Sequence, residues 1–293
     1  EVRDWARAGI ARLLAAGGGD CVGELANRIP VKVMARLIGL PVGDVEQLLG
    51  WAFSGGDILA GTTTPQQMIE LGASTGAMRA YLQEQFVQVQ AGASHDPPRH
   101  VMDELAAGVR EGAISEQEAV AIMIVLVGAA GESTSSLVGS AIRILAEDKR
   151  LQQRLRQHPD TLESFVEEVV RTEAPFKGHY RAVLQETQLG GVTIPPDARV
   201  FLLWAAANRD PAVFERPDAF DPERADIGEH LGFGHGIHFC IGARLARMEA
   251  RVILEELLCR TSDIGLDATA PVRHVPSIFV RRLDQLHLTL SAA

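Results

Sequence analysis

Apolar residues recur at helical spacing along most of the chain, and the longest such segment covers about residues 116–147. Ser115, followed three residues later by Glu118, predicts a capping box at its start. About thirty residues of helix span roughly 45 Å, and a middle that is apolar on all sides predicts a path through the core. Further helices are predicted at residues 1–14, 22–38, 42–53, 65–91, 101–111, 151–157, 161–172 and 243–258.

The pattern changes from helical spacing to short strands after Pro175. Residues 180–184, 191–194 and 199–204 alternate between apolar and polar positions or carry β-branched side chains, which is typical of strands. Residues 276–290 predict a hairpin near the end of the chain. The fold class that this pattern predicts is mainly α with small β-sheets.

Composition limits the classes of protein to which the chain can belong. It has 293 residues, of which 46% are hydrophobic, and its net charge of −10 argues against a nucleic-acid binder. Three cysteines, far apart in the chain, suggest no disulfide framework and fit a reducing, cytoplasmic location. The longest apolar run, residues 119–130, is too short to cross a bilayer, so we expect no membrane association.

Residues 230–242 have the most unusual composition, with four glycines, three histidines and one cysteine. Glycines at this density let a backbone bend tightly and approach a flat ligand. Cys240 falls where this loop gives way to the predicted helix that follows it. Because a helix N-terminus carries unpaired N–H groups and partial positive charge, it stabilises a thiolate, which is a metal ligand or a nucleophile.

Three interpretations of this loop compete. In the first, it is a surface loop before a helix, and its cysteine is buried and inert. In the second, His230, His235, His238 and Cys240 bind zinc, although structural zinc sites usually have paired Cys-x-x-Cys ligands and no second cysteine is near. In the third, Cys240 is the single axial ligand of a haem iron, and the glycines let the backbone lie against the porphyrin.

Six positions of the loop form a longer spaced motif: Phe233, Gly234, Gly236, His238, Cys240 and Gly242. This motif resembles the haem-binding signature of the cytochrome P450 family. The resemblance implies haem b as the cofactor, with Cys240 as the proximal ligand of the iron and Phe233 packed beside its sulfur. It also implies that His238 bonds to a haem propionate and that Gly234 and Gly242 belong to the cofactor-binding backbone.

Small and hydroxyl-bearing residues interrupt the middle of the long helix at residues 128–136, a combination that is typical of a kink. Glu132 lies within it, and the sequence leaves open whether its carboxylate is buried or exposed. The stretch is similar to the oxygen-binding kink of the P450 family, with Glu132 as the acid and Ser133 where threonine is usual. The resemblance implies proton delivery by Glu132 with either Ser133 or Thr134.

Glu168 and Arg171 lie three residues apart in a predicted helix, where an exposed ion pair of little energetic value is the ordinary interpretation. The spacing is also similar to the Glu-x-x-Arg signature of the P450 family. That resemblance implies a buried structural pair that locks the scaffold of the cysteine loop. Arg224 or Arg216 is expected as a third charged partner.

The resemblance assigns further residues to the cofactor and to the substrate. Arg181, in the first predicted strand, matches the family's arginine that pairs with a haem propionate, although an arginine on a strand edge is the simpler interpretation. Ala129, Phe176 and Ile278 match positions that line the substrate pocket. Their apolar character suggests a mostly apolar substrate.

The expected fold is a single cytochrome P450 domain over residues 1–293, with roughly the N-terminal quarter missing. The expected function is that of a haem-thiolate monooxygenase, which activates dioxygen to hydroxylate or otherwise oxidise a mostly apolar small organic molecule in specialised metabolism. A catalytically silent P450-like partner or activator of another biosynthetic enzyme is the alternative.

Three arginines after the cysteine, Arg244, Arg247 and Arg251, are spaced to form one ridge on the following helix. A basic ridge on an acidic chain predicts docking of an acidic ferredoxin, which a ferredoxin reductase would supply with electrons. A solvated helix face is the alternative explanation of the ridge.

Overall fold

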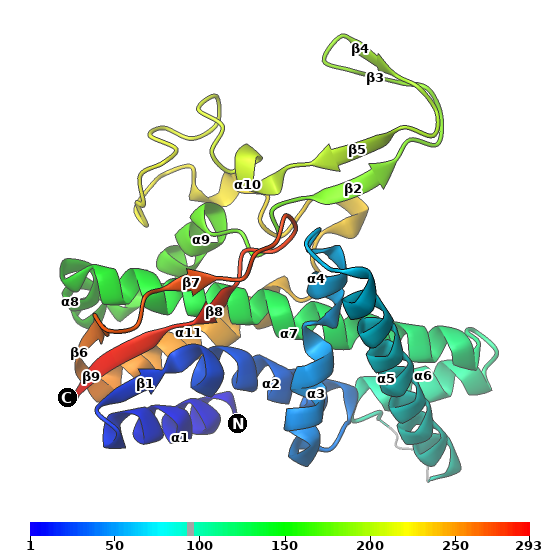
Figure 1. Ribbon diagram of the computed structural model, residues 1–293, viewed down its shortest axis with the longest axis horizontal. Helices are drawn as coiled ribbons and strands as arrows, with labels where there is room; N and C mark the ends of the chain where they lie inside the picture. The colour runs from blue at the N-terminus through cyan, green and yellow to red at the C-terminus, as the bar shows by residue number, and fades with distance from the viewer. Residues whose placement is uncertain (93–96) are drawn as a thin grey trace.

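The computed structural model describes residues 1–92 and 97–293, and the long helix α7 (Glu116–Glu147) runs through its middle (Figure 1). The predicted capping box is present at its start. Ser115 Oγ accepts a hydrogen bond from the Glu118 N–H at 3.2 Å, and the Glu118 carboxylate accepts one from the Ser115 N–H at 2.7 Å. The backbone stays α-helical through residues 128–136, so the small residues there do not end the helix.

The other helices surround α7 or connect the strands. They are α1 (Val2–Ala15), α2 (Arg28–Ile38), α3 (Val45–Ala52), α4 (Ser54–Leu59), α5 (Pro65–Ala91), α6 (Val101–Arg110), α8 (Lys149–Gln157), α9 (Leu162–Thr172), α10 (Trp204–Ala207) and α11 (Ala243–Arg260). The strands are β1 (Gly18–Asp20), β2 (His179–Ala182), β3 (Thr187–Leu189), β4 (Val192–Ile194), β5 (Arg199–Leu202), β6 (Thr261–Leu266), β7 (Arg273–His274), β8 (Leu283–Gln285) and β9 (His287–Ala292). The predicted class, mainly α with small β-sheets, is confirmed.

Some element boundaries differ from those that the apolar spacing predicts. Before α2 the chain forms a π-helix, Val22–Asn27, and before α3 it forms a 3₁₀ turn, Val42–Asp44. The short helices α4 and α10 are not evident from the sequence pattern. Trp204, predicted to end a strand, begins α10 instead, and its indole N–H donates to Nδ1 of His179 on β2 at 2.7 Å.

The strands form small antiparallel sheets. β9 lies between β1 and β6, whereas β2 pairs with β5, β3 with β4 and β7 with β8. The hairpin predicted over residues 276–290 is therefore only partly correct. Its turn joins β7 to β8, but β9 leaves the hairpin to pair with β1 and β6, because pairing with two distant strands satisfies both edges of its backbone.

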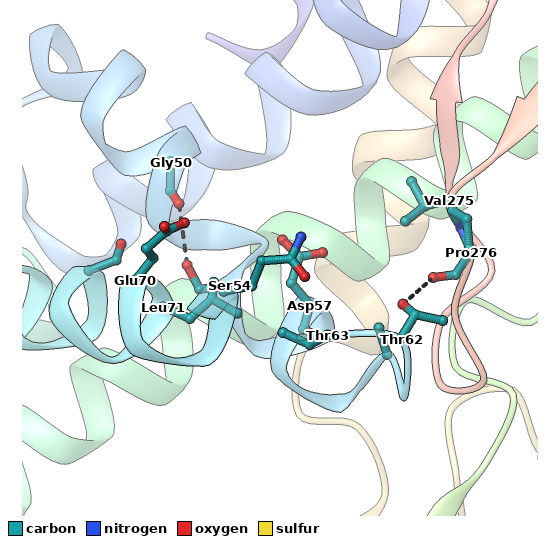
Figure 2. A pocket seen from close by; sticks show the side chains of 12 residues that line it. Gly50, Ser54, Asp57, Thr62, Thr63, Glu70, Leu71, Val275 and Pro276 are labelled. Carbon is teal, nitrogen blue, oxygen red and sulfur yellow. Dashed lines mark hydrogen bonds between the residues drawn. The ribbon is translucent and has the colours of Figure 1, made fainter. Parts of the chain in front are cut away.

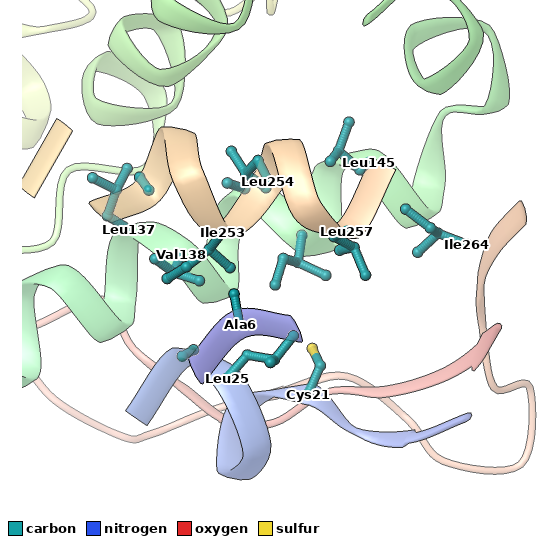
Figure 3. Close-up of a cluster of buried hydrophobic side chains, with 14 of the residues drawn as sticks. Ala6, Cys21, Leu25, Leu137, Val138, Leu145, Ile253, Leu254, Leu257 and Ile264 are labelled. Atoms are coloured by element: carbon teal, nitrogen blue, oxygen red, sulfur yellow. The ribbon is translucent and has the colours of Figure 1, made fainter. Parts of the chain in front are cut away.

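Two clusters of buried side chains pack along α7. In the first, Leu137, Val138 and Leu145 of α7 contact a group of side chains from α11 and from the N-terminal segment, part of which Figure 3 shows. In the second, Val120, Met123 and Val127 of α7 pack with apolar residues of α2, α3, α5 and α6. One helix thus belongs to both clusters, which fixes its position relative to the helices on either side.

By length and composition, α7 is the one described helix that could cross a membrane. Half of its most apolar window is buried inside the protein. The core helix of a globular protein has the same features, and α7 belongs to both buried clusters, so this is weak support for a membrane span.

Candidate functional site

The loop at residues 230–242 is held in shape by its own backbone. Cys240 N–H donates to the carbonyl of Phe233 at 2.9 Å, and Gly234 N–H donates to the carbonyl of Leu231 at 2.9 Å. Gly234 has a φ of 74° and Gly236 a φ of 70°, which are left-handed values that favour glycine. The loop therefore delivers Cys240 to the start of α11, as the sequence predicted.

The side chain of Cys240 is exposed, which contradicts the interpretation of an inert buried cysteine. Apolar side chains on both sides of it are exposed as well: Ile237 by 97%, Phe239 by 53% and Ile241 by 96%. A group of large apolar side chains at the surface indicates a binding site. A soft thiol donor within an apolar surface, on a backbone rich in glycine, fits the face of a haem, and Cys240 would hold its iron.

The structure does not support the second interpretation of the loop, a zinc site. His230 is buried, and its ring lies 2.9 Å from the carboxylate of Glu167, while its Nδ1 accepts a hydrogen bond from the Gly232 N–H at 3.2 Å. His235 and His238 are exposed. Among residues 1–92 and 97–293, no group of three or more His, Cys, Asp or Glu side chains could hold a metal ion.

Glu167 of α9 fixes the loop and the first turns of α11 from behind. Its carboxylate accepts hydrogen bonds from Arg247 at 2.5 and 2.7 Å and faces His230, while the Arg247 guanidinium lies 4.2 Å from the centre of the Phe233 ring. Burial acts to raise the pKa of Glu167, but the hydrogen bonds from Arg247 and His230 outweigh it and lower that pKa to about 2. Sequence reasoning missed Glu167, because its partners are more than sixty residues away.

The arginines after Cys240 do not form the free basic ridge that the spacing predicted. Arg247 is bound to Glu167, and Arg251 pairs with Glu255 at 2.6 Å and lies 4.0 Å from Glu163. Arg244 is exposed. The spacing placed the arginines on one helix but could not reveal that Glu167 of α9 binds Arg247 or that Glu255 of α11 binds Arg251.

The Glu168–Arg171 pair is buried, not exposed. Both side chains are 0% exposed, and two hydrogen bonds of 2.7 Å join the guanidinium to the carboxylate. Arg224 is the third partner, with Nε 3.1 Å from both carboxylate oxygens, while Arg216 pairs with Asp221 instead. The triad ties α9 to the segment that leads into the cysteine loop.

Glu132, Ser133 and Thr134 face different surroundings on α7. Glu132 is 2% exposed and its carboxylate lies 3.0 Å from Nε of Arg282, so it is buried and paired. Burial raises the pKa of Glu132 to about 7, although Arg282 acts to lower it. Ser133 Oγ donates to the carbonyl of Ala129 at 2.7 Å, the bond to the preceding turn that is typical of hydroxyl residues in helices, while Thr134 is 5% exposed.

The residues predicted for the propionates and the substrate lie on exposed or half-buried surfaces. Arg181 is exposed on β2, where its Nη1 donates to the Tyr180 carbonyl at 2.9 Å. Phe176 is half-buried, and its ring centre lies 5.1 Å from that of Phe279. Ile278 is 56% exposed. Among the described residues, no hydrogen bond or ion pair joins Arg181 to the cysteine loop.

A cleft of about 480 Å³ lies between α4, α5 and the segment before β8, as Figure 2 shows. Its walls include the polar residues Asp57, Thr62, Thr63, Glu70 and Ser74, together with Pro276. The predicted substrate residues do not line it, but Ile278 adjoins it, because its N–H donates to the carbonyl of the wall residue Ala60 at 2.9 Å. Sequence reasoning did not identify this cleft, because its walls come from segments about two hundred residues apart.

Glu249 of α11 is a buried carboxylate with no ion-pair partner among the described residues. It is 3% exposed, and its Oε2 has no hydrogen-bond partner in the described part of the chain. Burial raises the pKa of Glu249 to about 8, so the folded protein favours its protonated form.

The stability of the native protein is therefore expected to fall relative to that of the Glu249→Gln variant as the pH rises. An unfolded glutamate ionises near pH 4.5 but the folded one near pH 8. Between pH 5 and pH 7 the native protein should lose about 3 kcal/mol relative to the variant, at about 1.4 kcal/mol per pH unit. Urea unfolding at several pH values measures this difference, and parallel pH curves for the two proteins would contradict the assignment.

Comparison with known proteins agrees with this geometry. The sequence model of the family Cytochrome P450 matches residues 64–262. Over 271 residues the chain is 43% identical to Cytochrome P450 144 of Mycobacterium tuberculosis, a match that covers 92% of this chain and 61% of that protein. It is 34% identical over 264 residues to the erythromycin C-12 hydroxylase of Saccharopolyspora erythraea, which covers 88% of this chain and 66% of that protein.

The fold matches solved structures as well. One is a crystal structure of P450BioI in complex with an acyl carrier protein ligated to hexadec-9Z-enoic acid, with a TM-score of 0.91 and 29% identity over 99% of this chain and 73% of that chain.

The chain spans 61% of the length of the tuberculosis protein, which agrees with the predicted shortfall in length. The family match contains the cysteine loop, the Glu168–Arg171 pair and all of α7, and so the chain belongs to the cytochrome P450 family.

Proposed function

We propose that the protein is a haem-thiolate monooxygenase that oxidises a mostly apolar small organic molecule in specialised metabolism. One observation carries this proposal: the exposed thiol of Cys240, at the start of α11, lies among exposed apolar side chains in the family's cysteine motif. When bound, haem b supplies the activation of dioxygen and the insertion of one oxygen atom into the substrate.

The chain's own residues would hold the cofactor and move protons. Cys240 would ligate the iron, while Arg181 and His238, both exposed, would bind the propionates. Glu132 suits proton transfer, because a pKa of about 7 lets its carboxyl group gain or lose a proton near neutral pH. We assign the relay hydroxyl to Ser133 and not to Thr134, because Ser133 is the less buried of the two and shares a helix face with exposed Ala129.

The substrate would contact the side of α7 that carries Ala129. Phe176, Phe279 and Ile278 would supply further apolar surface, and the N–H of Ile278 donates to the carbonyl of Ala60 at 2.9 Å. One relative is named as a hydroxylase of erythromycin, and one similar structure contains a fatty acid bound to a carrier protein. Both of these small molecules are mostly apolar. A substrate of that general kind suits an apolar surface.

Electrons would come from a separate ferredoxin and its reductase. Arg244 of α11 is exposed, and it has no ion-pair partner among the described residues, whereas Arg247 and Arg251 are paired. Its positive charge, close to the cysteine loop, would attract an acidic partner protein.

Haem binding tests the proposed function. The protein is expressed from its complete reading frame with a haem precursor, reduced, and exposed to carbon monoxide. We expect the red-shifted Soret band of a carbon monoxide complex with a thiolate ligand, because Cys240 is accessible to iron. Absence of that band would overturn the proposal and favour a catalytically silent partner protein.

A further inference from the structure

The carboxylate of Glu132 is held by groups from two segments outside α7. Arg282, which precedes β8, places its Nε 3.0 Å from Glu132 Oε1, and its Nη2 lies 3.3 Å from Oδ1 of Asp57 on α4. The same guanidinium lies 4.6 Å from the centre of the Phe53 ring and is 12% exposed. One largely buried positive charge therefore faces two carboxylates from different helices.

The second segment is the backbone of α4 at Gly56. It lies close to the Glu132 carboxylate and acts to lower the pKa of that group. A Cβ atom at this position would lie 2.0 and 2.4 Å from the two carboxylate oxygens, so a residue other than glycine would displace Glu132 or α4. The close approach leaves the carboxylate little freedom to turn away from Arg282.

The charges around Glu132 act in opposite directions. Arg282 favours the ionised form of the carboxyl group, whereas burial and the negative charge of Asp57 favour the protonated form. Asp57 also belongs to the wall of the cleft shown in Figure 2, where its side chain is 44% exposed. The amount of positive charge that Arg282 offers to Glu132 therefore depends on a residue that a ligand in the cleft can reach.

We propose that Arg282 is a positioning residue that sets the orientation and protonation of Glu132, and that Asp57 opposes it from the wall of the cleft. When a ligand such as a protonated amine neutralises Asp57, the positive charge of Arg282 acts on Glu132 unopposed. Ionisation of the Glu132 carboxyl group is then favoured. The use of the Glu132 carboxyl proton in oxygen activation rests on the proposed function. The contacts among the three side chains do not depend on it.

The test is the protonation of Glu132 itself. In protein labelled with ¹³C at the glutamate carboxyl carbons, the Glu132 resonance is identified by its loss in Glu132→Gln and is followed from pH 4 to pH 10. Arg282→Gln should move its titration midpoint up by at least one pH unit, because the nearest positive charge is gone. Asp57→Asn should move it down, because the opposing negative charge is gone.

Two controls separate this electrostatic role from a general loss of structure. Arg282→Lys keeps the charge and should leave the midpoint within about half a unit of the native value, and it serves as the second variant if Arg282→Gln does not fold. Arg12→Gln removes an exposed arginine that is paired with Glu24 and should leave the midpoint unchanged. Shifts in the same direction for Arg282→Gln and Asp57→Asn, or no shift for either, would overturn the proposal.

The titration needs neither substrate nor turnover, so its failure is distinct from failure of the proposed function. If the thiolate band is absent but the midpoints move in opposite directions, the positioning role of Arg282 is supported and the proposed monooxygenase function is overturned. If the band is present but the midpoints do not move, the proposed monooxygenase function is supported and Arg282 is only a structural ion-pair partner of Glu132.

Discussion

Replacing Cys240 by alanine is expected to abolish the red-shifted carbon monoxide band, whereas the same change at Cys21 or Cys259 should leave it intact. Cys240 is exposed at the start of α11, within the glycine-rich loop. Cys21 is buried, and burial raises the pKa of its thiol well above the usual value, so it stays protonated and out of reach of iron. The spectrum of the reduced protein with carbon monoxide measures the effect.

Cys259 is the matched control for this experiment. It is exposed like Cys240, but it lies near the C-terminal end of α11, about 24 Å along the helix from Ala243. Both thiols are therefore exposed, but only that of Cys240 lies in the glycine-rich loop at the helix start. Loss of the band in Cys259→Ala, or its survival in Cys240→Ala, would show that another group holds the iron.

The sequence predicted best those features that are encoded locally. The capping box at Ser115 specifies the start of α7, and glycine spacing around Cys240 specifies a tight loop before a helix, because both depend on neighbouring residues. Glu168 and Arg171 also lie one helical turn apart. The sequence could not decide whether that pair was buried or whether Arg224 or Arg216 completed it, since the answer depends on the path of the segment between them.

The sequence predicted poorly the features that depend on distant partners. Arg282 lies 150 residues after Glu132, and Gly56, which also lies close to the Glu132 carboxylate, belongs to a distant segment as well. No local sequence pattern therefore predicts that these three residues meet. The spacing of three arginines suggested a basic ridge, but Arg247 is bound by Glu167 of α9 and Arg251 also lies close to that helix. Tertiary contacts, and not helical periodicity, decide whether a charged residue is available to a partner.

Replacing Glu168 by glutamine is expected to lower the free energy of unfolding by about 3–5 kcal/mol, the usual cost of removing one partner from a buried ion pair. The native carboxylate accepts hydrogen bonds from Arg171, from Arg224 and from the N–H of Asp221 at 2.8 Å. Glutamine is neutral, so it would leave the buried guanidinium of Arg171 without a counter-charge and that of Arg224 with Asp226 alone. Arg171 would keep its backbone acceptors, the carbonyls of Asn208, Pro217 and Ala219.

Equilibrium unfolding in urea measures this loss, and Glu163→Gln is its control on the same helix. The side chain of Glu163 is 81% exposed and lies 4.0 Å from Arg251, so its removal should cost a few tenths of a kcal/mol at most, about the value of a surface ion pair. Similar losses for the two variants would contradict a buried structural triad. A large loss for Glu168→Gln alone would establish that the triad stabilises the segment leading into the cysteine loop, because Glu168 is the one acid that bonds both arginines and the backbone at Asp221.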